Sequence, residues 1–154
     1  MDFWFSEKHS NDAKFSIRVN RQLYSGQSDF QRIDVFESQE FGRFLTLDGY
    51  MMLTERDEFI YHEMITHVPM AVHPHVRDVL VIGAGDGGVI RELCRYDDIA
   101  HIDMVEIDEE VVRVCREFLP KTACSLDDPR VTIHYADGLR FIRSKENCYD
   151  LIID

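Results

Sequence analysis

The sequence predicts an α/β protein in which a small antiparallel β domain is followed by the first half of a doubly wound parallel sheet. Three observations support this fold class. Asp48-Gly49 separates two apolar runs, a pattern typical of a two-residue hairpin. Val79–Ile82 is a continuous apolar run, as expected of a strand buried on both faces. Near residue 56 the sequence changes from strand-like segments to alternating helix and strand signals, which predicts domains at 1–56 and 57–154.

The residues before 56 are typical of strands. Apolar and polar side chains alternate in Arg32–Ser38, and the Asp-Gly turn favours positive φ at both of its positions. Phe3, Trp4 and Phe5 are expected in a strand core or a subunit interface. The expected strands are Phe15–Val19, Arg32–Ser38, Arg43–Leu47 and Tyr50–Leu53.

A helix is expected from Asp57 to about His67, where Pro69 interrupts the pattern. Its buried stripe is predicted to consist of four apolar residues at helical spacing. These are Phe59, Ile60, Met64 and Val68.

Strands and helices alternate in the remainder of the chain. Asp108 is predicted to cap a helix whose first turn carries Glu109 and Glu110, which complement the helix dipole. The expected strands are 79–82, 101–107, 131–135 and 149–153, and the expected helices are 88–96, 109–119 and 139–145.

The sequence stops directly after the last predicted strand. In a doubly wound sheet the ligand site lies where the strand order reverses, and we expect the strands beyond that reversal to be absent. The sequence therefore resembles a truncated protein, with one unpaired edge on Leu151–Ile153 that favours association.

Composition narrows the range of functions. Hydrophobic residues make up 45% of the 154 residues, which is enough for a core. The net charge of −12 disfavours nucleic acid and anionic membranes but suits a cationic small molecule. The four cysteines follow no C-x-x-C spacing, and no segment has signal-peptide or membrane-span character, so we expect a cytoplasmic protein.

No metal site is predicted. His62 and His67 are five residues apart, so their imidazoles do not share one helix face as they do in a zinc-protease helix.

A glycine-rich loop, Gly83-Ala84-Gly85-Asp86-Gly87-Gly88, follows the first buried strand. Glycines such as Gly83, Gly85 and Gly87 let the backbone approach a ligand closely. Glu106 ends the next strand, where a carboxylate can accept both ribose hydroxyls. Asp86 would repel pyrophosphate, so adenosine without phosphate is the better ligand.

Asp137-Gly138 follows the third strand of the parallel sheet. The Asp137 carboxylate can accept from the amino group of the base, and Gly138 leaves room for the ring. An N-cap role for Asp137 explains the same spacing equally well.

Several short segments occur in one order from about residue 3 to the end of the chain. They are Gln31, Gly42-Arg43, Leu47-Asp48-Gly49, Tyr61-His62-Glu63, His67-Val68-Pro69, Val81–Gly88, Val105–Asp108, Asp137-Gly138 and Tyr149–Ile153. In this order they resemble the spermidine synthase (polyamine aminopropyltransferase) family.

The resemblance implies an oligomerisation domain, giving a homodimer or homotetramer, and a methyltransferase-like Rossmann domain. It implies transfer of the aminopropyl group of decarboxylated S-adenosylmethionine, a co-substrate rather than a prosthetic group, to putrescine. The products are spermidine and 5′-methylthioadenosine. Carried over by position, the nucleoside contacts are Gln31, Glu106, Asp137 and Gly138.

The resemblance further implies that His62 and Asp86 contact the polyamine or aminopropyl group, with Tyr61 in the pocket wall. Asp86 is suited to the ammonium that ends the decarboxylated cofactor and would repel the carboxylate of ordinary S-adenosylmethionine. An S-adenosylmethionine-dependent methyltransferase is the alternative of the same fold.

The family has an acidic motif, D-x-[ST]-[DE]-P, one residue after the strand that resembles Tyr149–Ile153. By that spacing Asp154 directly precedes the motif, and the proton acceptor is the next residue. A register slip of one would make Asp154 that acceptor. We therefore expect an inactive fragment, and a non-catalytic nucleoside-binding or interaction module is the alternative of another class.

Overall fold

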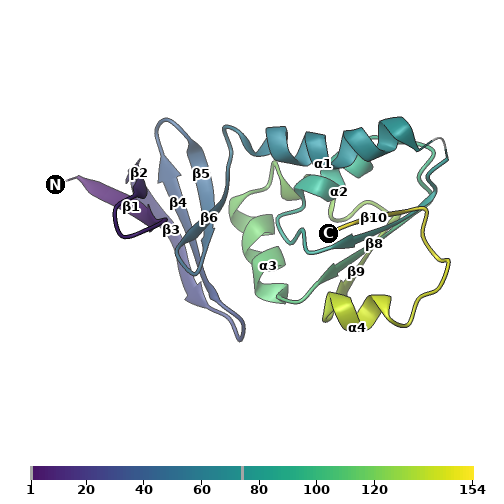
Figure 1. The fold of residues 1–154 in the computed structure, drawn as a ribbon. Coiled ribbons are helices and arrows are strands. Elements are labelled where there is room, and N and C mark those ends of the chain that lie inside the picture. Colours follow the sequence, from purple (N-terminus) through teal and green to yellow (C-terminus); the bar gives the residue numbers. More distant parts are fainter. Residues whose placement is uncertain (1, 74) are drawn as a thin grey trace. The chain divides into compact units, whose positions relative to one another are not determined.

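The computed structural model describes residues 2–73 and 75–154, and the chain divides into two compact units (Figure 1). The first unit extends to Glu58 and the second begins at Phe59. Within the described residues, none of the helices is both long and apolar enough to cross a membrane.

The first unit consists of antiparallel strands. The hairpin β1–β2 forms a two-stranded sheet, and the other four strands form a sheet in the order β3-β4-β5-β6. The strands are β1 Phe3–Lys8, β2 Lys14–Val19, β3 Arg21–Gln27, β4 Arg32–Ser38, β5 Gly42–Leu47 and β6 Tyr50–Thr54.

The Asp-Gly turn predicted from the sequence is confirmed. Asp48 and Gly49 adopt φ of 50° and 80°, and they join β5 to β6. Positive φ at both positions matches the twist of the two strands.

Alternating side chains of β4 and β5 supply the core of this unit. Ile33, Val35 and Phe44 are fully buried, and the ring of Phe5 on β1 lies 5.6 Å from that of Phe44. The sequence does not predict β3, which is rich in polar residues, and for β1 it suggests only that Phe3–Phe5 lie in a strand core or an interface. β3 is a strand because β4 supplies its hydrogen-bond partners, a cause that lies outside its own residues.

The second unit is a parallel sheet with helices. Its elements are α1 Glu58–Val72, β7 Asp78–Ile82, α2 Gly88–Leu93, β8 His101–Glu106, α3 Glu109–Phe118, the short 3-10 helix Ala123–Ser125, β9 Val131–Tyr135, α4 Gly138–Ile142 and β10 Leu151–Ile153.

The strand order is β10-β7-β8-β9. The chain moves outward from β7 to β8 and β9, and then returns through α4 to place β10 on the other side of β7. Figure 1 shows α2 and α4 on opposite sides of the sheet, as right-handed crossovers in opposite directions require. The expectation that no strand lies beyond the reversal was wrong, because β10 is such a strand. It forms one edge of the sheet, as expected.

The core of this unit surrounds β7 and β8. Val79, Leu80 and Val81 are buried, which confirms a strand covered on both faces. Asp108 caps α3 as predicted, with its side chain accepting from the Glu110 N–H at 3.1 Å.

Two predictions about α1 were wrong. The helix continues through Pro69 to Val72. Proline removes only one N–H donor, and the helical pattern resumes when the His73 N–H donates to the Pro69 carbonyl at 3.0 Å.

The predicted apolar stripe of α1 is also on the wrong side. Phe59, Ile60, Met64 and Val68 are exposed, whereas the buried residues of this helix are His62 and Thr66. Helical spacing shows which residues share a face but not which face is covered. Here the covered face is the one that carries His62, whose imidazole packs against Gly88.

Candidate functional site

The candidate site lies at the carboxyl ends of the parallel strands. The glycine loop follows β7, Glu106 ends β8, Asp137 follows β9, and Asp154 follows β10. Because the four strands are parallel, these residues lie along one edge of the sheet. The strand order reverses between β7 and β10, which is where doubly wound folds place their ligands.

The backbone of the glycine loop requires glycine at two positions. Gly83 and Gly87 have φ of 79° and 85°, in the left-handed region. Ala84 has φ of 81°, a conformation that costs energy for a residue with a side chain. A residue keeps such a conformation only where contacts with the surrounding structure compensate for its cost, so the conformation of this loop is fixed by its contacts.

Glu106 anchors this loop. Its Oε2 accepts from the Gly85 N–H and its Oε1 from the Asp108 N–H, each at 3.0 Å. A Cβ on Gly85 would lie 2.9 Å from Glu106 Oε2, so the absence of a side chain permits the contact. Burial raises the pKa of Glu106, although these backbone donors oppose the shift.

Each carboxylate oxygen of Glu106 has a second lone pair. The carboxylate can therefore hold the loop and still accept ribose hydroxyls. The sequence predicts the ribose contact but not the anchoring of the loop, because the hydrogen bond that the Gly85 N–H donates to Glu106 depends on the pairing of β7 with β8.

His62 and Asp86 form a second contact at this edge. The His62 Nε2 lies 3.3 Å from Asp86 Oδ1, and the imidazole is 3% exposed. Asp86 Oδ1 also accepts from the Gly88 N–H at 2.7 Å. The imidazole lies directly against Gly88, where any Cβ would overlap the ring. Neither contact of Asp86 uses Oδ2.

A pocket of about 90 Å³ opens beside this pair, between the ends of β7 and β10. It brings together two of the predicted amine contacts, the pocket-wall tyrosine and the last carboxylate of the chain. Its lining residues are Tyr61, His62, Ile65, Val81, Ile82, Ala84, Asp86, Val89, Ile153 and Asp154. Two carboxylates and a phenol around a small pocket form an environment suited to an ammonium group.

Asp137 is the N-cap of α4, and its Oδ1 accepts from the Arg140 N–H at 3.0 Å. The capping alternative for this residue is thus realised. Its Oδ2 lies 4.0 Å from Arg140 Nε, and a carboxylate oxygen with a second lone pair can also accept from a base. Gly138 lies against Ile82, which would overlap any Cβ at that position. Gln31 belongs to the first unit, in the turn before β4, where its N–H donates to Ser28 Oγ at 3.1 Å.

The sequence pattern assigns no role to His67. Its imidazole contacts Tyr96 and Glu92, both beyond the reach of a local pattern. The one hint in the sequence is the five-residue spacing from His62. At this spacing the two imidazoles point in different directions from the helix and therefore meet different partners. Among residues 2–73 and 75–154, no group of three or more metal-ligating side chains is arranged to hold a metal ion.

A further polar cluster lies on β8, centred on Asp103. Its carboxylate accepts from the Tyr149 hydroxyl at 2.6 Å and contacts His134 and His101 at 2.7 and 3.0 Å. Burial opposes ionisation, but these three partners together hold the pKa of Asp103 below its ordinary value. Burial and the bond to Asp103 raise the pKa of Tyr149.

Comparisons with known proteins agree with this architecture. Residues 58–154 match the spermine/spermidine synthase domain, and residues 3–55 match the spermidine synthase tetramerisation domain. The polyamine aminopropyltransferases of Alkaliphilus oremlandii and Clostridium botulinum strain Alaska E43 are each 67% identical over 153 residues. Those residues are 99% of this chain and 54% of each relative, so the chain spans about half the length of the curated relatives it matches.

Two solved structures are similarly close. The spermidine synthase of Thermotoga maritima has a TM-score of 0.96 at 44% identity, covering 98% of this chain and 53% of that one. A spermidine synthase in complex with the transition state analogue AdoDATO has the same TM-score and identity, and 52% of that chain is covered. With one domain model on each side of residue 56 and relatives of this identity, the chain belongs to the spermine/spermidine synthase family.

Proposed function

We propose that this chain supplies the nucleoside-binding and amine-binding residues of a polyamine aminopropyltransferase. The reaction moves the aminopropyl group of decarboxylated S-adenosylmethionine to putrescine and yields spermidine and 5′-methylthioadenosine. The observation that carries the proposal is the contact of the buried His62 with the half-buried Asp86, beside a small pocket at the strand-order reversal. We place the activity in the cytoplasm, because all four cysteines are free thiols.

The chemistry requires little bond activation by the protein. The amine nitrogen attacks the carbon next to the sulfonium, the carbon–sulfur bond breaks, and the sulfur leaves as a neutral thioether. The attacking ammonium must first lose a proton so that its nitrogen has a free lone pair, and the secondary ammonium formed by attack can leave with its proton. The protein therefore has to orient the amine and provide a proton acceptor.

The proposed roles within the second unit rest on positions at the carboxyl ends of the parallel strands. Asp86 attracts an ammonium, and His62 lies against it from α1. Glu106 accepts from the ribose, while Asp137 and Gly138 contact the base. The role of Gln31, which belongs to the first unit, as a further nucleoside contact rests on the family resemblance alone. Asp154 lines the pocket with Asp86. By the spacing of the family's acidic motif it directly precedes the proton acceptor, and it takes that role itself only if the register differs by one residue.

The test of this function uses Asp86→Asn, which keeps the acceptor for the Gly88 N–H and removes the charge. Decarboxylated S-adenosylmethionine and putrescine are expected to bind more weakly, with a binding free energy less favourable by about 1.5–3 kcal/mol, because a charge-assisted contact is lost. Affinity for 5′-methylthioadenosine, which has no ammonium, is expected to stay the same. Isothermal titration calorimetry measures all three ligands.

Asp98→Asn, at an exposed position before β8, is the matched control and is expected to change none of the three affinities. If the wild-type chain prefers carboxylated S-adenosylmethionine, the site belongs to a methyltransferase and the proposal is wrong. An equal loss of affinity for all three ligands in Asp86→Asn would show that Asp86 stabilises the fold and does not bind the ammonium group.

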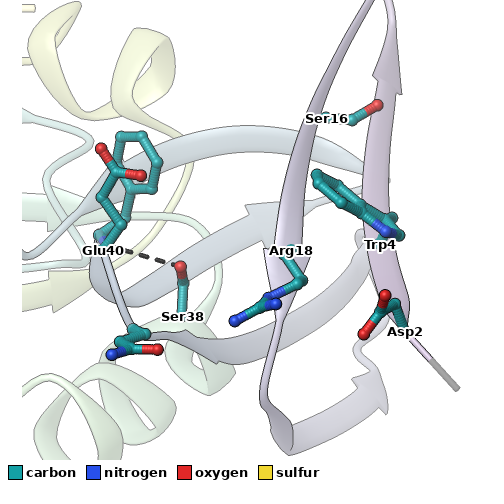
Figure 2. Close-up of a pocket in the computed structure, with 8 residues that line it drawn as sticks. Asp2, Trp4, Ser16, Arg18, Ser38 and Glu40 are labelled. Atoms are coloured by element: carbon teal, nitrogen blue, oxygen red, sulfur yellow. Dashed lines mark hydrogen bonds between the residues drawn. The ribbon is translucent and has the colours of Figure 1, made fainter.

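We propose further that the first unit assembles the protein into a homodimer or homotetramer through the β1–β2 hairpin. Phe3 and Trp4 are 65% and 59% exposed, whereas Phe5, which follows them in β1, packs against Phe36. Clefts of about 610 and 470 Å³ border the hairpin. In Figure 2 Trp4, Ser16 and Arg18 line the hairpin side of the larger cleft, with Ser38 and Glu40 opposite.

Trp4→Glu is expected to shift the protein toward smaller species, because it places a charge in an apolar contact between copies. Light scattering coupled to size-exclusion chromatography gives the mass. Trp4→Phe keeps an apolar ring and is expected to retain the wild-type mass. An unchanged mass for Trp4→Glu would place the interface elsewhere.

A further inference from the structure

Helix α1 is joined to α2 and the turn after it at two points. His62 lies on Gly88, the first residue of α2, and beside Asp86. Five residues further along α1, His67 reaches Glu92 near the end of α2 and Tyr96 just beyond it. The proposed function uses the first of these contacts and leaves the second unexplained.

Both ring nitrogens of His67 are engaged. Nδ1 lies 2.7 Å from the Tyr96 hydroxyl, and Nε2 lies 3.2 Å from Glu92 Oε2. An imidazole held at both of its ring nitrogens has a fixed ring orientation. The contact therefore specifies where this part of α1 lies on α2.

The partner of His67 is itself rigidly held. The Glu92 carboxylate is 4% exposed and accepts from Arg91 at 2.8 Å and from Arg95 at 2.7 Å. Burial disfavours its charge, but the two arginines outweigh burial and hold the pKa of Glu92 below its ordinary value. His67 thus contacts a fixed, ionised acceptor on α2.

Apart from His62 and Thr66, α1 contributes no fully buried side chain to its contact with the sheet unit. The large apolar residues Phe59, Ile60 and Met64 are exposed, and the buried residues are His62 and Thr66. Successive residues of a helix are rotated by about 100°, so a slip of one position would carry His62 away from Gly88. A specific contact elsewhere on the helix can prevent that slip.

We propose that His67 is a positioning residue that fixes α1 on α2 and thereby holds the His62 imidazole against Asp86 and Gly88. The proposal concerns the geometry of the site without ligand. It rests on the proposed function only where it extends to amine binding.

The test is the nuclear Overhauser contact between the His62 ring protons and the Gly88 α protons in the wild-type chain and in His67→Leu. We expect the cross-peaks to be lost in His67→Leu while the amide spectrum of β7, β8 and β9 stays folded. A residue that only adds stability would lower the unfolding temperature and leave these cross-peaks intact below it. His67→Gln, which keeps a donor and an acceptor, is expected to restore part of their intensity.

His75→Leu, at an exposed position after α1, is the matched control and is expected to keep the cross-peaks. Wild-type intensity in His67→Leu would overturn the proposal, and so would equal loss in His75→Leu. If His67→Leu does not fold, Tyr96→Phe decides: it removes the hydroxyl from Nδ1, so weaker cross-peaks support the proposal and unchanged ones overturn it.

Calorimetry with putrescine extends the test to function. In His67→Leu we expect putrescine to bind roughly tenfold more weakly, a change of about 1.4 kcal/mol, with unchanged affinity for 5′-methylthioadenosine. If the wild-type chain binds no putrescine, the proposed function fails while the cross-peaks still decide the positioning role. If putrescine binds His67→Leu as well as wild type although the cross-peaks are lost, positioning is upheld and its extension to amine binding is wrong.

Discussion

Glu106→Gln is expected to weaken binding of 5′-methylthioadenosine by about 1.5–3 kcal/mol, because charge-assisted bonds to the ribose hydroxyls are lost. The substitution has a second effect on the same loop. The two oxygens of Glu106 accept from the Gly85 and Asp108 N–H groups, and glutamine replaces one oxygen with a donor. One of these buried N–H groups then loses its partner. Calorimetry measures the affinity, and urea denaturation measures the free energy of unfolding.

Asp103→Asn is the control for the ligand effect, since Asp103 lies on the same strand but belongs to the other polar cluster. It is expected to leave the affinity for 5′-methylthioadenosine unchanged. Equal affinities for wild type and Glu106→Gln would remove Glu106 from the nucleoside site and leave only its role in anchoring the loop.

The pH dependence of Glu106 follows from its raised pKa. The folded state holds the proton more tightly than the unfolded chain does, so stability decreases as pH rises from the unfolded pKa, about 4.3, through the folded value. At neutral pH the buried charge therefore opposes folding. Such a cost is consistent with a residue retained for binding.

Asp103→Asn is expected to lower the free energy of unfolding at neutral pH by about 2–4 kcal/mol. The carboxylate contacts Tyr149, His134 and His101, which belong to separate segments of the second unit. An amide offers one acceptor oxygen in place of two, so at least one of these partners is left without an acceptor. Urea denaturation at pH 7 gives the difference.

The difference is expected to shrink in acid. Because the pKa of Asp103 is lowered on folding, its contribution is fully present above the unfolded value of about 3.9 and is lost as pH falls through the folded value. The gap between wild type and Asp103→Asn is thus retained at pH 5 and reduced below about pH 4. A gap of the same size at all pH values would show that shape, and not charge, is responsible.

Asp127→Asn is a matched control for this experiment. Asp127 pairs with Arg116 at 2.6 Å, but its side chain is 82% exposed. Surface pairs of this kind contribute about 0–1 kcal/mol, so the substitution is expected to have a small effect at any pH. Equal losses for Asp127→Asn and Asp103→Asn would contradict the role of the buried cluster.

Local signals predicted much of this fold. The Asp48-Gly49 turn, the buried run Val79–Val81 and the Asp108 cap were correct because each depends on neighbouring residues. The glycine loop with Glu106 also pointed to the edge of the sheet at which the candidate site lies. Turn chemistry, burial on both faces and capping are short-range causes and can be identified in a single sequence.

The sequence by itself determined which residues form the strands of the parallel sheet and which polar groups follow them, but tertiary structure decided their arrangement. Whether β10 lies beside β9 or beside β7 depends on the direction of the crossover that leads to it. The position of β10 beside β7 brings Asp154 into the pocket with Asp86. The buried face of α1 likewise depends on Gly88, which lies 26 residues after His62. Contacts between segments far apart in the chain leave no periodic pattern in either segment, so only the folded chain reveals them.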